Sequence, residues 1–378
     1  MKILVLGAGL VGGPMVMDLA TEAGFDVSVA DVNGDALERI KNKVQVRTIQ
    51  KDLGNPGTIR DLAADADLVL NAVPGFMGFQ SLKAILEAGK NVVDIAFFPE
   101  DPFDLDDLAK QNGVTAVVDC GVAPGMSNVL IGYADSLLDE TRAAEVYVGG
   151  LPKVRVKPWE YKAVFSPIDV IEEYIRPAYL VEKGERVCKP ALSEPELMEF
   201  ARVGTLESFN TDGLRSLAKT MDIPDMKEKT LRYPGHIEKI TMLKETGFFS
   251  QKPIDFNGMQ ISPLDFTTRM LFPKWKLDEG EQDITVMKIK VEGVKDGKQR
   301  RYTYDLFDEY DSTTAVHSMA RTTGYTATTA VRMLAKGVFD RKGICPPEFV
   351  GREAACTRFL LEGLAKKGVV YNETIRDF

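Results

Sequence analysis

The sequence predicts an α/β fold, in which a doubly wound parallel sheet is followed by a second, α+β domain. Three observations support this expectation. A glycine-rich turn, residues 7–12, lies between a short apolar run and an apolar helical stretch. Strand-like and helix-like stretches alternate up to about residue 120. Beyond residue 125 the rhythm changes to longer strands with fewer helices between them.

Six short apolar runs in the first part are typical of buried parallel strands. They are Ile3–Leu6, Val27–Ala30, Val44–Ile49, Leu68–Ala72, Asn91–Ile95 and Val114–Val118. Helical stretches lie between them, for example Gly34–Lys43, Gly57–Ala64, Phe79–Glu87 and Leu105–Gln111. Ligands of such sheets bind beyond the carboxyl ends of the strands, so we expect functional residues there.

The turn after the first strand has the spacing of a dinucleotide-binding motif. Gly7 allows the tight turn, Gly9 lets a pyrophosphate approach the backbone, and Gly12 lets the helix pack on the strand. The free N–H groups at the start of the helix, around Leu10 and Val11, suit a phosphate. A purely structural turn without a ligand is the alternative.

Asp31 ends the second strand, where a carboxylate accepts hydrogen bonds from the ribose hydroxyls and repels a 2′-phosphate. The next residues, 32–34, include no arginine, so NAD is favoured over NADP. We assign four more residues to the cofactor site, at the ends of the third and fourth strands: Asp52, Asn71, Ala72 and Val73.

The rest of the chain predicts a mixed domain and a helical tail. We expect a strand at Glu145–Val148 and a hairpin of Ile284–Val291 and Arg301–Leu306 around Asp296-Gly297. Helices are expected at Pro167–Tyr174, Gly213–Lys219, Ser262–Leu271, Thr322–Lys336 and Phe359–Lys367.

Composition excludes several classes of function. The net charge is −9 over 378 residues with the two signs interspersed, which argues against a nucleic-acid or anionic-membrane partner. No apolar run reaches transmembrane length. The four cysteines have no metal-like spacing and fit a reducing cytoplasm, so we expect a cytoplasmic protein without a metal.

Several stretches resemble the saccharopine dehydrogenase family, most closely its NAD-dependent lysine 6-dehydrogenase branch. They are residues 5–10, Asp119–Met126, Tyr147–Pro152, Glu160-Tyr161, Val164–Ser166, Thr230–His236, Met319–Thr322 and Gly343–Glu348. The resemblance implies a Rossmann domain (1–125), an α+β substrate and dimerisation domain (126–320) and a C-terminal segment returning to the first domain (321–378). It also implies oxidation of an amine-bearing carbon of an L-lysine-like substrate, by a homodimer.

A lysine-type substrate needs a cation for its carboxylate, carboxylates for its amines and a base for the departing proton. We assign Arg232 as the cation, with Tyr161, Cys120 and Thr211 as further substrate-binding residues. Candidate catalytic residues are Asp94, Asp119, His236 and Lys162. Each has a structural alternative: helix capping for the aspartates, an ion pair for Arg232, a buried hydrogen-bonded ring for His236 and packing for Cys120.

Two other functions stay open at this point. Saccharopine dehydrogenase would need further cations for a second dicarboxylate. A catalytically silent NAD-binding sensor would have an apolar second domain without converging charges, and Arg232, Lys162, Asp94 and Asp119 count against it.

Overall fold

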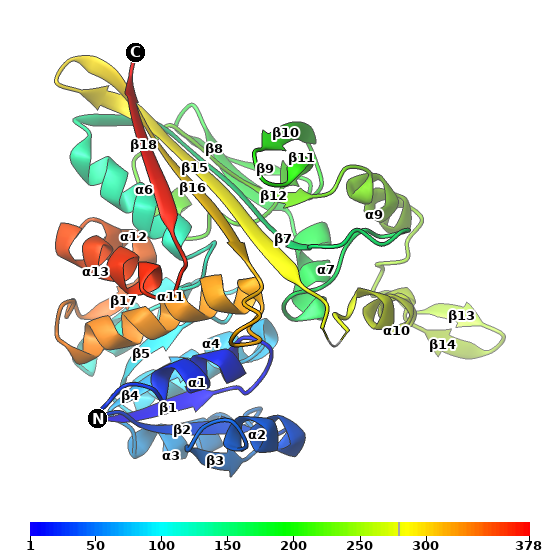
Figure 1. Cartoon of the computed structure of the whole chain (residues 1–378). Coiled ribbons are helices and arrows are strands. Elements are labelled where there is room, and N and C mark those ends of the chain that lie inside the picture. Colours follow the sequence, from blue (N-terminus) through cyan, green and yellow to red (C-terminus); the bar gives the residue numbers. More distant parts are fainter. Residues whose placement is uncertain (279) are drawn as a thin grey trace. The chain divides into compact units, whose positions relative to one another are not determined.

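The computed structural model describes residues 1–278 and 280–378, which form two compact units (Figure 1). The first comprises residues 1–140, 295–297 and 319–371, and the second comprises residues 141–294, 298–318 and 372–378. The boundary expected near residue 125 lies inside the first unit, because helix α6 (Met126–Leu137) belongs there.

The first unit contains the predicted doubly wound sheet, in the order β17-β6-β5-β4-β1-β2-β3, with every neighbouring pair parallel. Six strands match the expected runs within a few residues: β1 (Lys2–Leu6), β2 (Asp26–Asp31), β3 (Arg47–Gln50), β4 (Leu68–Asn71), β5 (Asn91–Asp94) and β6 (Thr115–Val117). The seventh, β17 (Gly343–Cys345), was not predicted. It comes from the distant C-terminal part of the chain and pairs with β6.

Helices on the faces of this sheet begin at identifiable caps. The Asn33 carboxamide oxygen accepts from Ala36 N–H at the start of α2 (Gly34–Lys41), and Asn55 similarly caps α3 (Pro56–Ala64). The remaining helices are α1 (Gly12–Leu19), α4 (Gly75–Glu87), α5 (Asp106–Gln111), α11 (Ser318–Ala335), α12 (Pro347–Gly351) and α13 (Ala354–Ala365), with a 3₁₀ turn at Pro102–Leu105.

The second unit is built on a nine-stranded mixed sheet, ordered β10-β11-β12-β7-β15-β16-β18, with β8 pairing β12 and β9. Its strands are β7 (Glu140–Pro152), β8 (Ala178–Glu182), β9 (Glu185–Lys189), β10 (Glu196–Phe200), β11 (Gly204–Asn210), β12 (Asp225–Arg232), β15 (Asp283–Lys295), β16 (Lys298–Glu309) and β18 (Tyr371–Asp377). A separate hairpin pairs β13 (Ile254–Phe256) with β14 (Met259–Ile261).

Four helices accompany this sheet: α7 (Pro167–Ile175), α8 (Leu217–Thr220), α9 (His236–Glu245) and α10 (Pro263–Trp275). The helix expected over Gly213–Lys219 is wrong in its first half. Arg215 has φ 51°, a left-handed conformation that a right-handed helix excludes, so α8 begins only at Leu217.

The long hairpin β15–β16 turns at Asp296 and Gly297, as predicted, and both residues have positive φ. Its alternating apolar residues, such as Ile289, Val291 and Tyr304, are buried within the chain itself. These residues therefore belong to the core of the second unit.

A buried ion-pair network attaches the returning C-terminal segment to the first helix of the sheet. Arg332 on α11 donates to the Asp18 carboxylate on α1 at 2.8 Å and to Glu22 at 2.7 Å. Lys367 and Thr328 also donate to Asp18. Burial raises the pKa of Asp18, but the charge of Arg332 and the hydrogen bond from Lys367 outweigh it and hold the pKa below 3.8.

Replacing Asp18 by Asn removes the central charge of this network, so we expect the first unit to lose about 3 kcal/mol of stability at pH 7. Because the folded-state pKa is lowered, the stabilisation is present above pH 3.8 and is lost as the pH falls through the folded pKa. Urea unfolding of both proteins from pH 7 to pH 3 tests this. A deficit that is equal at both ends would contradict it, and Glu38→Gln, in an exposed pair with Lys41, is the matched control.

Candidate functional site

The glycine-rich turn in the first unit has the geometry of an anion-binding loop. Gly7 has φ 103°, and a Cβ there would lie 2.6 Å from the Ala72 carbonyl oxygen. A Cβ on Gly12 would lie 2.2 Å from the carbonyl oxygen of Gly7, whereas nothing lies within 4 Å of one on Gly9. The loop thus packs tightly against Ala72, the residue after β4, and leaves space at Gly9, where a phosphate is expected.

Asp31, at the carboxyl end of β2, is fixed by this loop. One carboxylate oxygen accepts from Ala8 N–H at 2.6 Å and the other from Asn33 N–H at 2.8 Å. Each oxygen retains a further lone pair, so the carboxylate is held in place and can still accept from ribose hydroxyls. Asp52, which follows β3, is exposed and accepts from Gly54 N–H at 2.8 Å.

Two further observations fit a dinucleotide at this edge. Large apolar side chains that follow the strands are exposed rather than packed, namely Leu10 after β1, Val32 after β2 and Phe76 after β4, the last 77% exposed. The Oδ1 atom of Asn71, at the end of β4, is buried without a hydrogen-bond partner among the described residues. Apolar surfaces and an orphaned acceptor suit the rings and the carboxamide of a nicotinamide dinucleotide.

Asp94, at the end of β5, is fully buried and holds two neighbouring residues by hydrogen bonds. It accepts from the Asn71 carboxamide at 2.6 Å and from Ala96 N–H at 2.7 Å. These contacts set the orientation of the Asn71 side chain and stabilise the turn after β5, so the structure gives Asp94 a positioning geometry. Val73, beside Asn71 and Ala72, is buried.

Asp119 and Cys120 follow β6 and lie beside the end of β5, since Cys120 N–H donates to the Asp94 carbonyl at 2.9 Å. Asp119 is nearly buried and has φ 52°. Burial, with the charges of Asp119 and Asp94, raises the pKa of the Cys120 thiol to about 12. The thiol is therefore neutral at physiological pH, and it is not a nucleophile.

The second unit holds Arg232 in a cluster of aromatic side chains at the end of β12. Arg232 is buried and donates to the Glu173 carboxylate at 2.8 Å, to the Tyr174 hydroxyl at 3.2 Å and to its neighbour's carbonyl. Its guanidinium lies 4.6 Å from the ring centroid of Tyr161. These contacts occupy three of the five N–H donors of the guanidinium.

Tyr161 and His236 belong to the same cluster, with ring centroids 5.0 Å apart, and both pack beside Trp275. The two ring nitrogens of His236 bond the Tyr174 hydroxyl and the Trp159 carbonyl, each at 3.0 Å. Burial and the charge of Arg232 lower the pKa of His236 to about 3. The imidazole is therefore neutral, and its two nitrogens are both engaged.

Glu228 lies four residues before Arg232 on β12, so the two side chains project from the same face of the strand. Thr211 donates to its carboxyl at 2.5 Å, and the hydroxyls of Thr211 and Thr230 are 2.9 Å apart. Burial raises the pKa of Glu228 to about 8, and burial also raises the pKa of Glu173 despite its pairing with Arg232. The cluster thus combines one fixed cation with two carboxyl groups that protonate easily.

Lys162 lies next to Tyr161 in sequence, but its side chain is engaged elsewhere. The ammonium pairs with Glu281 at 2.8 Å and Asp278 at 3.5 Å and donates to the Lys276 carbonyl at 2.9 Å. A desolvated, neutral lysine would be needed for a general base. The Lys162 ammonium is instead held by two carboxylates and one carbonyl.

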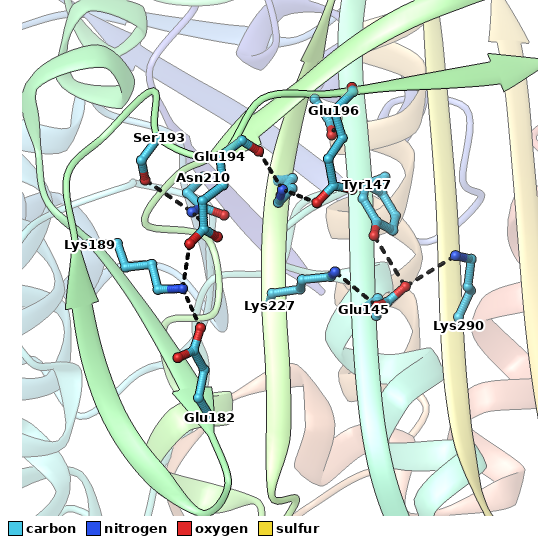
Figure 2. A network of polar contacts seen from close by, with 12 residues as sticks. Glu145, Tyr147, Glu182, Lys189, Ser193, Glu194, Glu196, Asn210, Lys227 and Lys290 are labelled. Carbon is cyan, nitrogen blue, oxygen red and sulfur yellow. Dashed lines mark hydrogen bonds and ion pairs between the residues drawn. The ribbon is translucent and has the colours of Figure 1, made fainter.

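Figure 2 shows the opposite face of the same sheet, where charged side chains pair with each other. Glu145 on β7 is bound by Lys227 at 3.0 Å and by Lys290 at 3.1 Å, on the strands on either side. Lys229 bonds Glu196 and the Glu194 carbonyl. Strand alternation therefore separates the face that carries these ion pairs from the face that carries Glu228 and Arg232.

Four residues that the sequence predicted for the site lie in this region of the second unit: Arg232, Tyr161, His236 and Thr211. The sequence assigned no role to four others that surround them: Glu173, Tyr174, Glu228 and Trp275. The period of two along β12 was a usable signal for Glu228, because residues 228, 230 and 232 share a face. No such signal marks Glu173, one of several acids on α7. Among the described residues, no cluster of three or more metal-ligating side chains occurs.

The fold and the strand-end site define a nucleotide-binding α/β protein with a second, mixed unit. Family models agree with this division. Residues 3–117 match the model described as "Saccharopine dehydrogenase NADP binding domain", and residues 121–369 match "Saccharopine dehydrogenase C-terminal domain". The chain belongs to the saccharopine dehydrogenase family of oxidoreductases, and the cofactor of its first domain is a pyridine nucleotide.

Individual relatives are distant. A saccharopine dehydrogenase (NADP⁺, L-glutamate-forming) from Pyricularia oryzae is 25% identical, with 92% of this chain and 93% of that protein covered. Mouse mitochondrial alpha-aminoadipic semialdehyde synthase is 22% identical over 98% of this chain, which spans 47% of that longer protein. Saccharopine dehydrogenase from Saccharomyces cerevisiae has the same fold, with TM-score 0.81, 17% identity and 99% of both chains covered.

In the part of the chain that the structure describes, no helix has the length and apolar character needed to cross a membrane.

Proposed function

We propose that the protein is an NAD-dependent dehydrogenase that oxidises the amine-bearing side-chain carbon of L-lysine or a closely similar amino acid. One observation carries this proposal: the buried guanidinium of Arg232 packs against aromatic rings and pairs with the Glu173 carboxylate, on the strand face that also carries Glu228. A cation beside two carboxyl groups complements an α-amino acid, which carries one carboxylate and one ammonium. The two remaining N–H donors of Arg232 suit a bidentate carboxylate.

The preference for NAD rests on the end of β2. Asp31 is held by Ala8 and Asn33, and its charge would repel a 2′-phosphate. No arginine stands at positions 32–34 to accept that phosphate. The family model for this domain is described as NADP-binding, so the specificity of this chain is our inference from Asp31.

The bound nicotinamide would take a hydride from the amine-bearing carbon. Before that step the substrate's ammonium must lose a proton, because the amine of free lysine is almost fully protonated at neutral pH. We assign this role to Asp119, which follows β6 at the carboxyl edge of the parallel sheet, where ligands of such sheets bind.

A second candidate is saccharopine dehydrogenase activity, which the name of the Pyricularia oryzae relative favours. Saccharopine carries a second dicarboxylate and would need more cations than Arg232. Within the described residues, Lys162 already pairs with carboxylates of this chain, and Lys229 projects from the opposite face of β12. We therefore rank the lysine-type substrate first.

Steady-state formation of the reduced cofactor tests the proposal directly. Purified protein is assayed with L-lysine, L-ornithine or saccharopine, each with NAD or NADP, from pH 7 to pH 10. We expect the highest kcat/KM with L-lysine and NAD, rising with pH toward about 9 as the bound amine loses its proton. Turnover of saccharopine alone would establish the second candidate, and no turnover with any pair would favour a silent sensor.

Replacing Asp31 by Ser should weaken NAD binding about tenfold, a loss of roughly 1.4 kcal/mol, and narrow the preference over NADP. The ribose loses its acceptor, and a 2′-phosphate is no longer repelled. Fluorescence titration with both reduced cofactors measures this, with Asp26→Ser at the other end of β2 as the matched control. Equal affinity of the unaltered protein for NADP would refute the assignment.

Replacing Arg232 by Lys keeps the charge but removes the planar fork, so we expect KM for the amino acid to rise about tenfold to a hundredfold with unchanged NAD affinity. Arg155→Lys is the control, since Arg155 also stacks on a tyrosine but is more exposed. A lower Tm with unaltered kinetics would show that Arg232 serves only as the ion-pair partner of Glu173.

A further inference from the structure

Helix α11 is buried on every side except at one residue. From residue 318 to residue 334, each residue is buried apart from Thr323, which is partly exposed. The ion-pair network around Asp18 joins the helix to α1, and α13 packs closely on it, since a Cβ on Gly363 would lie 2.4 Å from Cγ2 of Thr329. Thr323 is therefore the one position in this stretch where the helix can reach a ligand.

The hydroxyl of Thr323 also differs from those of its neighbours. The Thr326 hydroxyl donates to the Thr322 carbonyl at 2.7 Å, and the Thr329 hydroxyl donates to the carbonyl four residues before it at 2.6 Å. Among the described residues, the Thr323 hydroxyl bonds only the sulfur of Met319, at 3.4 Å, and a thioether is a weak acceptor. The Thr323 oxygen thus donates weakly and keeps both lone pairs for a ligand.

Thr323 lies beside the turn that follows β6, at the carboxyl edge of the parallel sheet. A Cβ on Gly121 would lie 3.3 Å from Cγ2 of Thr323 and 4.0 Å from its Oγ1. The Gly121 N–H donates to the Asp119 carbonyl at 3.0 Å, so this turn is tight and Asp119 belongs to it. The Thr323 side chain is thus next to the turn that carries the residue to which we assign the proton transfer.

The next residue, Gly324, brings the same part of α11 against the start of α1. A Cβ on Gly324 would lie 2.9 Å from Cγ of Met15 and 3.5 Å from Cγ1 of Val11. Val11 is the N-cap residue of α1, where phosphates are expected. Thr323 therefore lies between the expected phosphate site and the turn of Asp119, where the nicotinamide and the reacting carbon are expected.

We propose that the Thr323 hydroxyl accepts a hydrogen bond from the substrate nitrogen whose carbon is oxidised. The inference rests on the proposed function, because it requires an amine that loses a proton to Asp119. The neutral amine then gives up a hydride, with its two electrons, from its carbon to the nicotinamide of NAD. The C–N bond becomes a double bond, and the resulting iminium carries one positive charge and, for a primary amine, two N–H groups.

Two N–H groups on one planar nitrogen need two acceptors on different sides. The Asp119 carboxyl group can accept from one of them and the Thr323 oxygen from the other. An N–H of a charged group that stays unpaired in a partly buried site costs more than a neutral one. The second acceptor also fixes the plane of the iminium, and hence the geometry of hydride transfer. Thr323 thus favours primary amines over secondary amines, whose iminium has a single N–H group.

Two variants separate the hydroxyl of Thr323 from its methyl group. Thr323→Val has nearly the same shape but no hydroxyl, and Thr323→Ser keeps the hydroxyl but loses the methyl group that packs on Gly121. Each is assayed with NAD and the amine that the unaltered protein oxidises best. We expect kcat/KM about tenfold to a hundredfold lower for Thr323→Val, because a hydrogen bond to a charged group is lost, and most of the activity retained by Thr323→Ser.

Binding of NADH, measured by fluorescence titration, should be the same for all variants, because the hydroxyl is assigned to the substrate. Thr326→Val on the same helix is the matched control, since its hydroxyl bonds a backbone carbonyl. This control should keep kcat/KM, and circular dichroism should show every variant folded.

An unchanged kcat/KM in Thr323→Val would overturn the assignment. So would an equal loss in Thr323→Ser, which would show that packing on Gly121 matters, or a weaker affinity for NADH, which would place the hydroxyl on the cofactor. Failure of the unaltered protein to oxidise any amine would instead overturn the proposed function on which the assignment rests, and this failure is recognised without any substitution.

Discussion

The ion pairs that Arg332 and Lys367 form with Asp18 hold the returning end of the chain against the first helix of the sheet. The sequence leaves the first unit after residue 140 and comes back at residue 319. Asp18 on α1 and Glu22, which follows α1, offset the charges of Arg332 and Lys367, so the network carries no unbalanced charge. Strand β17, which pairs with β6, and helices α12 and α13, which pack on α6, follow α11 in the chain.

Both candidate sites use the same physical device, in which short-range backbone rules decide where a side chain projects. In the first unit, the carboxyl ends of parallel strands bring Asn71, Asp94 and the residues after β6 together. In the second unit, strand alternation sends Glu228 and Arg232 to one face and Lys227 and Lys229 to the other. On the face of Lys227 and Lys229 the charged side chains pair with each other, as Figure 2 shows. The face of Arg232 holds a cation among aromatic rings.

Local patterns were enough to predict six strands of the parallel sheet, the glycine loop, the place of Asp31 and the turn at Asp296. They failed where the answer depended on distant residues. Strand β17 contains only three residues, and nothing nearby in sequence indicates that it extends a sheet formed two hundred residues earlier. The expected helix at Gly213 was shortened by the left-handed backbone of Arg215, and no side-chain pattern signals that conformation.

By itself the sequence determined the parallel sheet, the glycine loop and the acidic residue at the end of β2, because each depends on contacts within a few tens of residues. The tertiary structure alone decided which charged groups remain for a ligand. It engaged Lys162 with Glu281, enclosed His236 between Tyr174 and Trp159, and set Glu173 beside Arg232. The physical reason is that burial and pairing control the charge of a side chain, and both are set by residues far away along the chain.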